Sequence, residues 1–155
     1  MIIVECYTDE FLVKSMGFPR RQIKHEGGKG KVMEIVKKKD MTVGIIDEDP
    51  YSDQPSDLEN YIEKDARSTV KLLIRKDDDS KRLIQISPYL EHWLLDRARQ
   101  NRIAPKDFGL PNDPKEMHSI PHVKRDRNFH NFLNELIKAD DEIDTLKKWI
   151  WRLVK

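Results

Sequence analysis

The stretch from Thr42 to Pro50 reads TVGIIDEDP and decides the fold. Its first part is a continuous run that is β-branched apart from Gly44, which is typical of a strand buried on both faces of a parallel sheet. The apolar run ends at Asp47, and Glu48, Asp49 and Pro50 follow it. We therefore expect a strand over Thr42–Ile46 whose carboxyl end carries acidic side chains.

The chain before this strand alternates between strand and helix patterns. Met1–Tyr7 (MIIVECY) predicts a first strand, and Thr8 is the expected N-cap of a helix that stops near Gly17. A weaker strand at Gln22–His25 leads into a glycine loop and a helix over Lys31–Lys39. This rhythm predicts an α/β fold with a mostly parallel, Rossmann-like sheet and flanking helices.

The chain after this strand is expected to extend the sheet and then turn helical. Thr69–Ile74 and Arg82–Ile86 flank a polar turn and predict a hairpin, while Asp57–Lys64 predicts a short helix. From Pro88 onward, apolar residues recur at spacings of three and four residues, which predicts helices, and Asp140 and Asp141 are expected to split the last of them. The segment 103–122 has little periodicity and is interpreted as loop with short helical turns. We therefore expect one compact domain, with an α/β core over residues 1–95 and a C-terminal helical cap over residues 96–155.

Length, composition and charge limit the possible functions. A chain of 155 residues fits one domain. With 29 Lys and Arg against 28 Asp and Glu, the net charge of +1 gives no overall argument for nucleic-acid binding. A single cysteine, Cys6, excludes disulfide frameworks and Cys-rich zinc sites. The N-terminus lacks a signal-peptide pattern and no apolar run approaches membrane-spanning length, so we expect a soluble, cytoplasmic protein without a membrane partner.

Acidic residues follow two of the expected strands. Glu5 comes after the first apolar run, and Asp47 and Asp49 come after the third. Carboxyl ends of parallel strands meet at one edge of a sheet, and two residues two apart on extended backbone project to the same side. Carboxylates brought together repel one another unless a cation neutralises them, and hard oxygen ligands favour Mg2+ or Mn2+. The pattern therefore predicts a divalent-metal site.

Three motifs resemble those of the TOPRIM family, the α/β domain of topoisomerases, bacterial primases and the overcoming-lysogenization-defect nucleases. They are Glu5 with Asp9 (VECYTD), the glycine loop His25–Gly30 (HEGGKG), and Asp47-x-Asp49. The segment Ser87–Leu95 (SPYLEHWLL) is similar to a Pro-x-x-Glu-x-Trp segment of small stand-alone TOPRIM-like proteins, including the RloB group of phage-defence proteins. The resemblance covers residues 1–95. It departs from the family pattern at Cys6, where the family has glycine.

The resemblance implies metal-dependent cleavage of phosphodiester bonds. Asp47 and Asp49, with Asp9 or Glu91, would hold Mg2+ or Mn2+, and Glu5 would bind metal or act as general acid or base. All of these acids except Glu5 have a plainer interpretation: Asp47 and Asp49 as a solvated turn at the end of a strand, Asp9 as a residue that complements a helix dipole, and Glu91 as a helix-surface residue. Cys6 is interpreted as a small buried residue rather than a nucleophile.

Positive charge is segregated along the chain. Eight Lys or Arg residues lie between Lys14 and Lys38, whereas nine acids between Asp40 and Asp65 face only Lys64. Such a basic segment beside an acidic edge suits a phosphate polymer. Lys29, in the glycine loop, is the candidate for stabilising transition-state charge, although lysines in such positions are more often solvated than catalytic. The candidate nucleic-acid contacts are Lys24, Lys29, Lys31, Lys124, Arg125 and Arg127.

Histidines and tryptophans receive structural interpretations. His118, His122 and His130 have no ligand spacing, so a polar surface is expected rather than a zinc site. Trp93, Trp149 and Trp151 are spaced for helix packing.

Three functions follow as hypotheses. The first is a metal-dependent nuclease. The second is a non-catalytic nucleic-acid- or phosphate-binding subunit that works with a partner ATPase, as in related defence systems. The third is a small-phosphate hydrolase, because fold does not fix substrate. The sequence leaves open whether the substrate is DNA or RNA, and whether a homodimer forms.

Overall fold

The computed structural model describes residues 1–154, apart from the side chains of Lys124 and Val154. The strands are β1 (Ile2–Val4), β2 (Ile23–His25), β3 (Thr42–Asp47), β4 (Tyr61–Arg67), β5 (Val70–Arg75) and β6 (Asp78–Ile86). The α-helices are α1 (Tyr7–Ser15), α2 (Lys29–Lys38), α3 (Leu90–Gln100), α4 (Pro114–His118), α5 (Arg127–Ala139) and α6 (Asp141–Val154). Short 3-10 helices are η1 (Arg20–Gln22), η2 (Ser56–Asn60), η3 (Pro105–Phe108) and η4 (Val123–Arg125).

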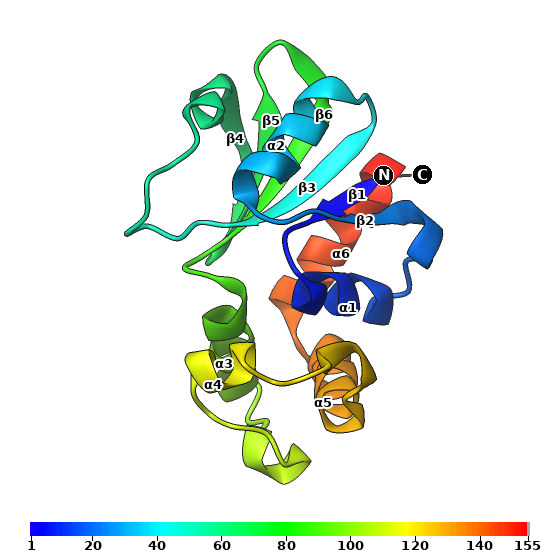
Figure 1. Cartoon of the computed structure of the whole chain (residues 1–155), viewed down its shortest axis with the longest axis vertical. Helices are drawn as coiled ribbons and strands as arrows, with labels where there is room; N and C mark the ends of the chain where they lie inside the picture. The colour runs from blue at the N-terminus through cyan, green and yellow to red at the C-terminus, as the bar shows by residue number, and fades with distance from the viewer. Residues whose placement is uncertain (155) are drawn as a thin grey trace.

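The strands form one six-stranded sheet in the order β2-β1-β3-β6-β5-β4. The pairs β1–β2, β1–β3 and β3–β6 are parallel, while β5 pairs antiparallel with both β6 and β4. Figure 1 shows α3, α4 and α5 grouped on the side of the sheet toward which the parallel strands run. The predicted α/β fold, with a mostly parallel sheet, flanking helices and C-terminal helices, is confirmed.

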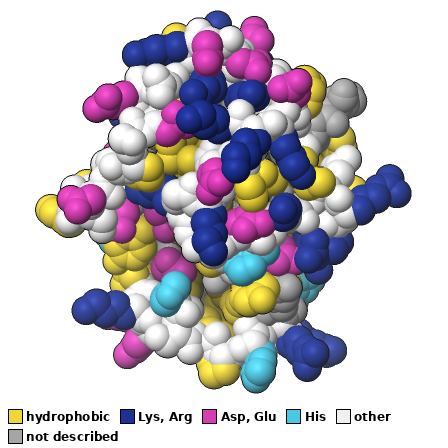
Figure 2. Space-filling model, turned by 45° about the horizontal axis from the view of Figure 1, so that its top comes forward, with side chains coloured by type: hydrophobic (Ala, Val, Ile, Leu, Met, Phe, Trp, Pro, Cys, Tyr) yellow, Lys and Arg dark blue, Asp and Glu magenta, His cyan; other side chains and the backbone are white. Residues whose placement is uncertain are grey.

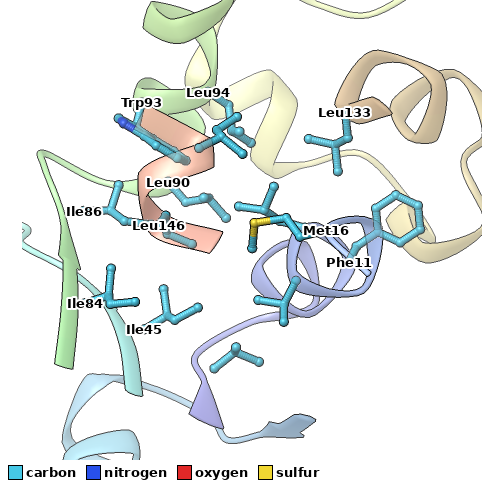
Figure 3. Close-up of a cluster of buried hydrophobic side chains, with 14 of the residues drawn as sticks. Phe11, Met16, Ile45, Ile84, Ile86, Leu90, Trp93, Leu94, Leu133 and Leu146 are labelled. Carbon is cyan, nitrogen blue, oxygen red and sulfur yellow. The ribbon is translucent and has the colours of Figure 1, made fainter. Parts of the chain in front are cut away.

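Helices cover both faces of the sheet. On one face, alternate strand residues join α1, α3, α5 and α6 in the larger core cluster. Figure 3 shows this cluster, with side chains from Ile45, Ile84, Ile86, Leu90, Trp93, Leu146, Phe11, Met16 and Leu133. On the other face, α2 covers a smaller cluster that includes Ile3, Val32 and Leu83. The larger cluster contains residues from before and after residue 95. The division into an α/β core over residues 1–95 and a helical cap over residues 96–155 stays a prediction.

The approach of α2 to the sheet depends on Gly44. A Cβ atom added there would lie 2.7 Å from Val32 Cγ1 and 2.9 Å from Leu83 Cδ2, closer than real Cβ atoms come. Glycine in β3 therefore sets the distance between helix and sheet.

Strand β4 was missed from the sequence. The helix predicted over Asp57–Lys64 is wrong: η2 is followed by β4 at the edge of the sheet. Every β4 residue after Tyr61 is exposed, and the pairing with β5 shifts register between Glu63 and Asp65. A polar edge strand carries no buried alternation, so its hydrophobic pattern cannot reveal it.

The two N-terminal helices differ slightly from expectation. The N-cap of α1 is Cys6 rather than Thr8, and α2 begins at Lys29 rather than Lys31. Met33 is buried in α2, whereas Ile35 is only partly buried.

The C-terminal half follows the sequence expectation closely. The segment from 103 to 122 contains only η3 and the short α4, and the long helix does break at Asp140. Asp140 Oδ2 accepts a hydrogen bond from the Ile143 N–H at 3.0 Å and so starts α6. Trp93 and Trp149 are buried as expected, whereas Trp151 is exposed. Among the helices of the described residues, none has the length and apolar character needed to span a membrane.

Candidate functional site at the acidic edge of the sheet

Four carboxylates meet at the carboxyl edge of the parallel strands, and we call them the acidic cluster: Glu5, Asp9, Asp47 and Glu91. Glu5 directly follows β1 and Asp47 ends β3, and these two strands are parallel neighbours. Asp9 and Glu91 lie in the first turns of α1 and α3. Elements far apart in sequence thus bring together four of the predicted site residues.

Asp47 links the end of β3 to the start of α3. Its Oδ1 accepts a hydrogen bond from the Leu90 N–H at 3.1 Å, which places Glu91, the next residue, beside the cluster. Burial, followed by the negative charges of Asp9, Glu5 and Glu91, raises the pKa of Asp47 to about 9. Asp47 is therefore protonated at neutral pH unless a cation takes the proton's place.

Asp9 lies fully inside the cluster. Its Oδ2 accepts hydrogen bonds from the Cys6 N–H and the Cys6 Sγ, both at 3.2 Å. Its Oδ1 is buried and has no hydrogen-bond partner in the described part of the chain. Burial is the main cause that raises the pKa of Asp9 to about 7, and the charges of Glu5 and Glu91 add to it. Asp9 is thus both a helix-capping residue and a member of the cluster.

Glu5 receives opposing influences. Burial raises its pKa to about 7, while the positive charge of Lys29 and a hydrogen bond from the Asp47 N–H act in the opposite direction. The charges of Asp49 and Glu91 raise it further. A carboxyl group with a pKa near neutrality can give or take a proton at physiological pH, which is the property that a general acid or base needs.

Lys29 connects the glycine loop to the acidic edge. Its Nζ donates hydrogen bonds to the Glu48 carbonyl oxygen at 2.9 Å and to Gln54 Oε1 at 3.0 Å. Gly28 precedes it as the N-cap of α2 with φ of 126°, a conformation that L side chains rarely adopt. The glycine loop and the chain after β3 are therefore neighbours, as the segregation of charge suggested.

Asp49 is placed differently from expectation. The backbone leaves the extended conformation there, with φ of 47°, and Asp49 Oδ2 accepts a hydrogen bond from Ser52 Oγ at 2.8 Å. The condition under which Asp47 and Asp49 would project to the same side therefore fails. Asp49 still lies close enough to influence the pKa of Glu5.

His118 is a site residue that sequence reasoning missed. Its Nδ1 lies 2.9 Å from Glu91 Oε1, because α4 packs against α3. The residues are 27 positions apart and belong to separate helices, so no motif spacing could have revealed the contact. His118 is exposed, as predicted for a polar surface residue, and its contact with Glu91 is the feature that the sequence did not reveal.

The Cys6 thiol is partly buried and donates to Asp9. Burial, followed by the charge of Asp9, raises the pKa of this thiol above its usual range. A thiol that stays protonated is a poor nucleophile, in agreement with the structural interpretation of Cys6.

The candidate nucleic-acid contacts are scattered. Lys24 forms an ion pair with Glu26 at 3.1 Å, and Lys31 is exposed on α2. Arg125 lines a pocket beside α1, Arg127 is exposed at the start of α5, and the Lys124 side chain lies outside the described residues. Figure 2 shows Lys and Arg side chains over the upper half of one face, and histidines lower on the same face beside hydrophobic side chains.

The donor chemistry of the acidic cluster suits Mg2+ or Mn2+, because every member offers carboxylate oxygens and Asp9 Oδ1 is buried without a partner. As the side chains stand in residues 1–154, however, no three His, Cys, Asp or Glu residues are arranged to hold a metal ion. Protonated carboxyl groups have no need to converge on a common point. Occupation by a cation would therefore require these groups to lose protons and reorient.

Comparison with known proteins adds no relative: no family model, no curated protein and no solved structure matches the chain. The resemblance to TOPRIM domains thus stays a prediction from the sequence motifs.

Proposed function

We propose that the protein is a divalent-metal-dependent nuclease that hydrolyses phosphodiester bonds of nucleic acid at the acidic cluster. The observation that supports it is the convergence of Glu5, Asp9, Asp47 and Glu91, all buried or partly buried, at the carboxyl edge of the sheet. Burying several carboxyl groups side by side costs free energy unless a cation or protons offset their repulsion. Strongly raised pKa values in such a cluster are typical of functional sites.

In this proposal, Asp47, Asp9 and Glu91 hold Mg2+ or Mn2+, with Asp49 close by on the following loop. The cation, when bound, would polarise the phosphate and favour ionisation of the attacking water. Glu5, with its pKa of about 7, takes or gives the proton. Lys29, held beside the cluster by the Glu48 carbonyl, offsets the negative charge that develops on the phosphate.

The basic residues would act on the nucleic-acid backbone away from the cleaved bond. Lys24 lies on β2 and Lys31 on α2, the two elements that flank the glycine loop. Such contacts position a polymer without reading its sequence, so they do not distinguish DNA from RNA.

Calorimetric titration with Mn2+ and with Mg2+ tests the metal site. Wild-type protein is expected to bind the metal. The double variant Asp9→Asn/Asp47→Asn is expected to bind it at least tenfold more weakly, although each asparagine can still accept the hydrogen bond that the aspartate accepts from a backbone N–H. Asp79→Asn is the matched control, because Asp79 is an exposed residue at the distant end of β6. Equal binding by all three proteins would refute the assignment.

Cleavage of single- and double-stranded DNA and RNA, with and without the metal, then tests the reaction. Metal-dependent cleavage that disappears in the double variant supports a nuclease. Nucleic-acid binding without cleavage would instead favour the second hypothesis, a binding subunit that needs an ATPase partner. Hydrolysis of mononucleotides alone would identify a small-phosphate hydrolase.

A further inference from the structure

We propose that the pocket between the start of α1 and the α4–η4 segment binds one nucleotide with an unpaired base, so that the substrate strand is single-stranded at the acidic cluster. This inference deepens the proposed function. That the bound strand is the substrate rests on the proposed function, whereas nucleotide binding rests on the pocket alone.

The pocket is large enough for a nucleotide. Its volume is about 580 Å3, within the range of about 300 to 1,000 Å3 that is usual for small-molecule sites. Cys6, Tyr7 and Thr8 line one side, and the other side runs from His118 to Arg125. The second side comes from the cap, outside the region that resembles TOPRIM domains.

The wall of the pocket carries groups that bind an anion. His118, His122 and Arg125 all line it, and a guanidinium group can donate two parallel hydrogen bonds to a phosphate. Neither His122 nor Arg125 forms an ion pair with any residue of the described part of the chain. His122 and Arg125 are therefore not neutralised by a carboxylate of the described residues, whereas His118 contacts Glu91.

The pocket also carries groups that suit a planar base, on both of its sides. Tyr7 is 53% exposed, and its ring stacks on that of His25 with centroids 4.3 Å apart and an angle of 17°. Ile120 and Val123 add apolar surface. Aromatic rings stack on nucleobases of any sequence, and they do so only when the base is free of its partner strand. A phosphate group beside a flat heteroaromatic ring is the ligand that matches both parts of the wall.

The pocket adjoins the acidic cluster at two points. Cys6 directly follows Glu5 in the chain, and His118 contacts Glu91 at 2.9 Å. A nucleotide held here would present its phosphodiester link toward the cluster. The pocket would therefore hold the nucleotide next to the cleaved bond. A base that is paired within a duplex could not enter it.

Binding is tested without divalent metal, in EDTA, so that the result does not depend on the metal site. Wild-type protein is titrated by calorimetry with a nucleoside 5′-monophosphate, with the uncharged nucleoside and with inorganic phosphate. The monophosphate is expected to bind best. His122→Gln/Arg125→Gln and Tyr7→Ala are each expected to weaken it at least tenfold, whereas Arg21→Gln, an exposed arginine of η1, leaves it unchanged. The variant Asp47→Asn should retain binding, which separates this site from the metal site.

A short single-stranded oligonucleotide and the same sequence as a blunt duplex then distinguish a free nucleotide from a strand. Tighter binding of the single strand than of the mononucleotide or duplex assigns the pocket to a polymer. Absence of monophosphate binding by folded wild-type protein overturns the inference, as does equal binding of inorganic phosphate and monophosphate. Preference for the duplex overturns the claim that the base is unpaired. None of these outcomes depends on whether metal binding or cleavage is found.

Discussion

The imidazole Nδ1 of His118 and the carboxylate Oε1 of Glu91 lie 2.9 Å apart, and this contact joins the cap to the acidic cluster. Glu91 is buried, whereas the His118 side chain is 69% exposed. A partner of this kind fixes the orientation of a carboxylate that ligates a metal, and its loss typically costs 10- to 100-fold in affinity or activity.

We therefore expect His118→Ala to lower Mn2+ affinity about tenfold, because Glu91 loses the group that orients it. His118→Asn, which keeps a hydrogen-bonding side chain, is expected to recover part of the affinity. The measurement is calorimetric Mn2+ binding. His130→Ala provides the control, since His130 lies on α5 and contacts Asn134. Unchanged affinity in His118→Ala would show that the contact plays no part in metal binding.

Metal binding at pH 7 is expected to release protons. The pKa values of Glu5 and Asp9 are about 7 and that of Asp47 is about 9, so the cation must displace protons from the cluster. Calorimetric titrations in buffers with different ionisation enthalpies measure the number released. Release should fall in Asp47→Asn, and binding should strengthen as the pH rises from 6 to 9. Affinity independent of pH would contradict the raised pKa values.

Without metal, stability is expected to fall as the pH rises. The pKa of Asp47 is about 9 in the folded protein against an ordinary value of 3.8, so the folded state keeps a proton that the unfolded state releases. The contribution of protonated Asp47 to the free energy of unfolding is therefore fully present below pH 4 and is lost progressively toward pH 9. The midpoint of thermal unfolding, followed by circular dichroism, should decrease across this range more steeply in wild type than in Asp47→Asn. Asp79→Asn should keep the wild-type slope.

Arg97 is expected to be important for stability. It forms ion pairs with Asp140 at 2.7 Å and with Glu142, and the side chains of both acids are almost completely buried. Removing one partner of a buried ion pair typically costs about 3–5 kcal/mol, so Arg97→Met should lower the free energy of unfolding by about that amount. Arg99→Met is the matched control on the same helix, because Arg99 is 72% exposed and should change stability by less than about 1 kcal/mol. Urea denaturation measures both.

Two glycine substitutions should have opposite effects. Gly44→Ala places a Cβ 2.7 Å from Val32 Cγ1, and overpacking of this kind costs about 1–3 kcal/mol. Gly30 lies in α2 with no atom within 4 Å of an added Cβ, so Gly30→Ala should stabilise the helix by about 0.5–1 kcal/mol. Equal effects of the two substitutions in urea denaturation would contradict the close approach of α2 to β3.

The sequence predicted most of the elements that build the site, because buried strands and helices show their hydrophobic period. The runs at Thr42–Ile46 and after Pro88 correspond closely to β3 and α3. The convergence of Glu5 and Asp47 followed from the parallel arrangement of their strands. Strand β4 escaped prediction, because its exposed side chains carry no such period.

The missing parts of the site are those that depend on long-range packing. The contact of His118 with Glu91 requires α4 to return to α3, which neither residue signals locally. The direction of the Asp49 side chain could not be predicted, because nothing in Asp-x-Asp shows whether the backbone stays extended or takes a positive φ. The pocket likewise combines the start of α1 with a segment more than 100 residues later, so it exists only in the folded chain.

The register shift in β4 has a consequence for encounters between copies of the chain. An outer strand exposes unpaired peptide groups that invite another strand to add, and irregular pairing and charged side chains are the usual protection against it. In β4, the irregularity falls between Glu63 and Asp65, beside Lys64 and near Arg67. This edge of the sheet is therefore a poor template for intermolecular strand addition, which disfavours edge-to-edge aggregation of the protein.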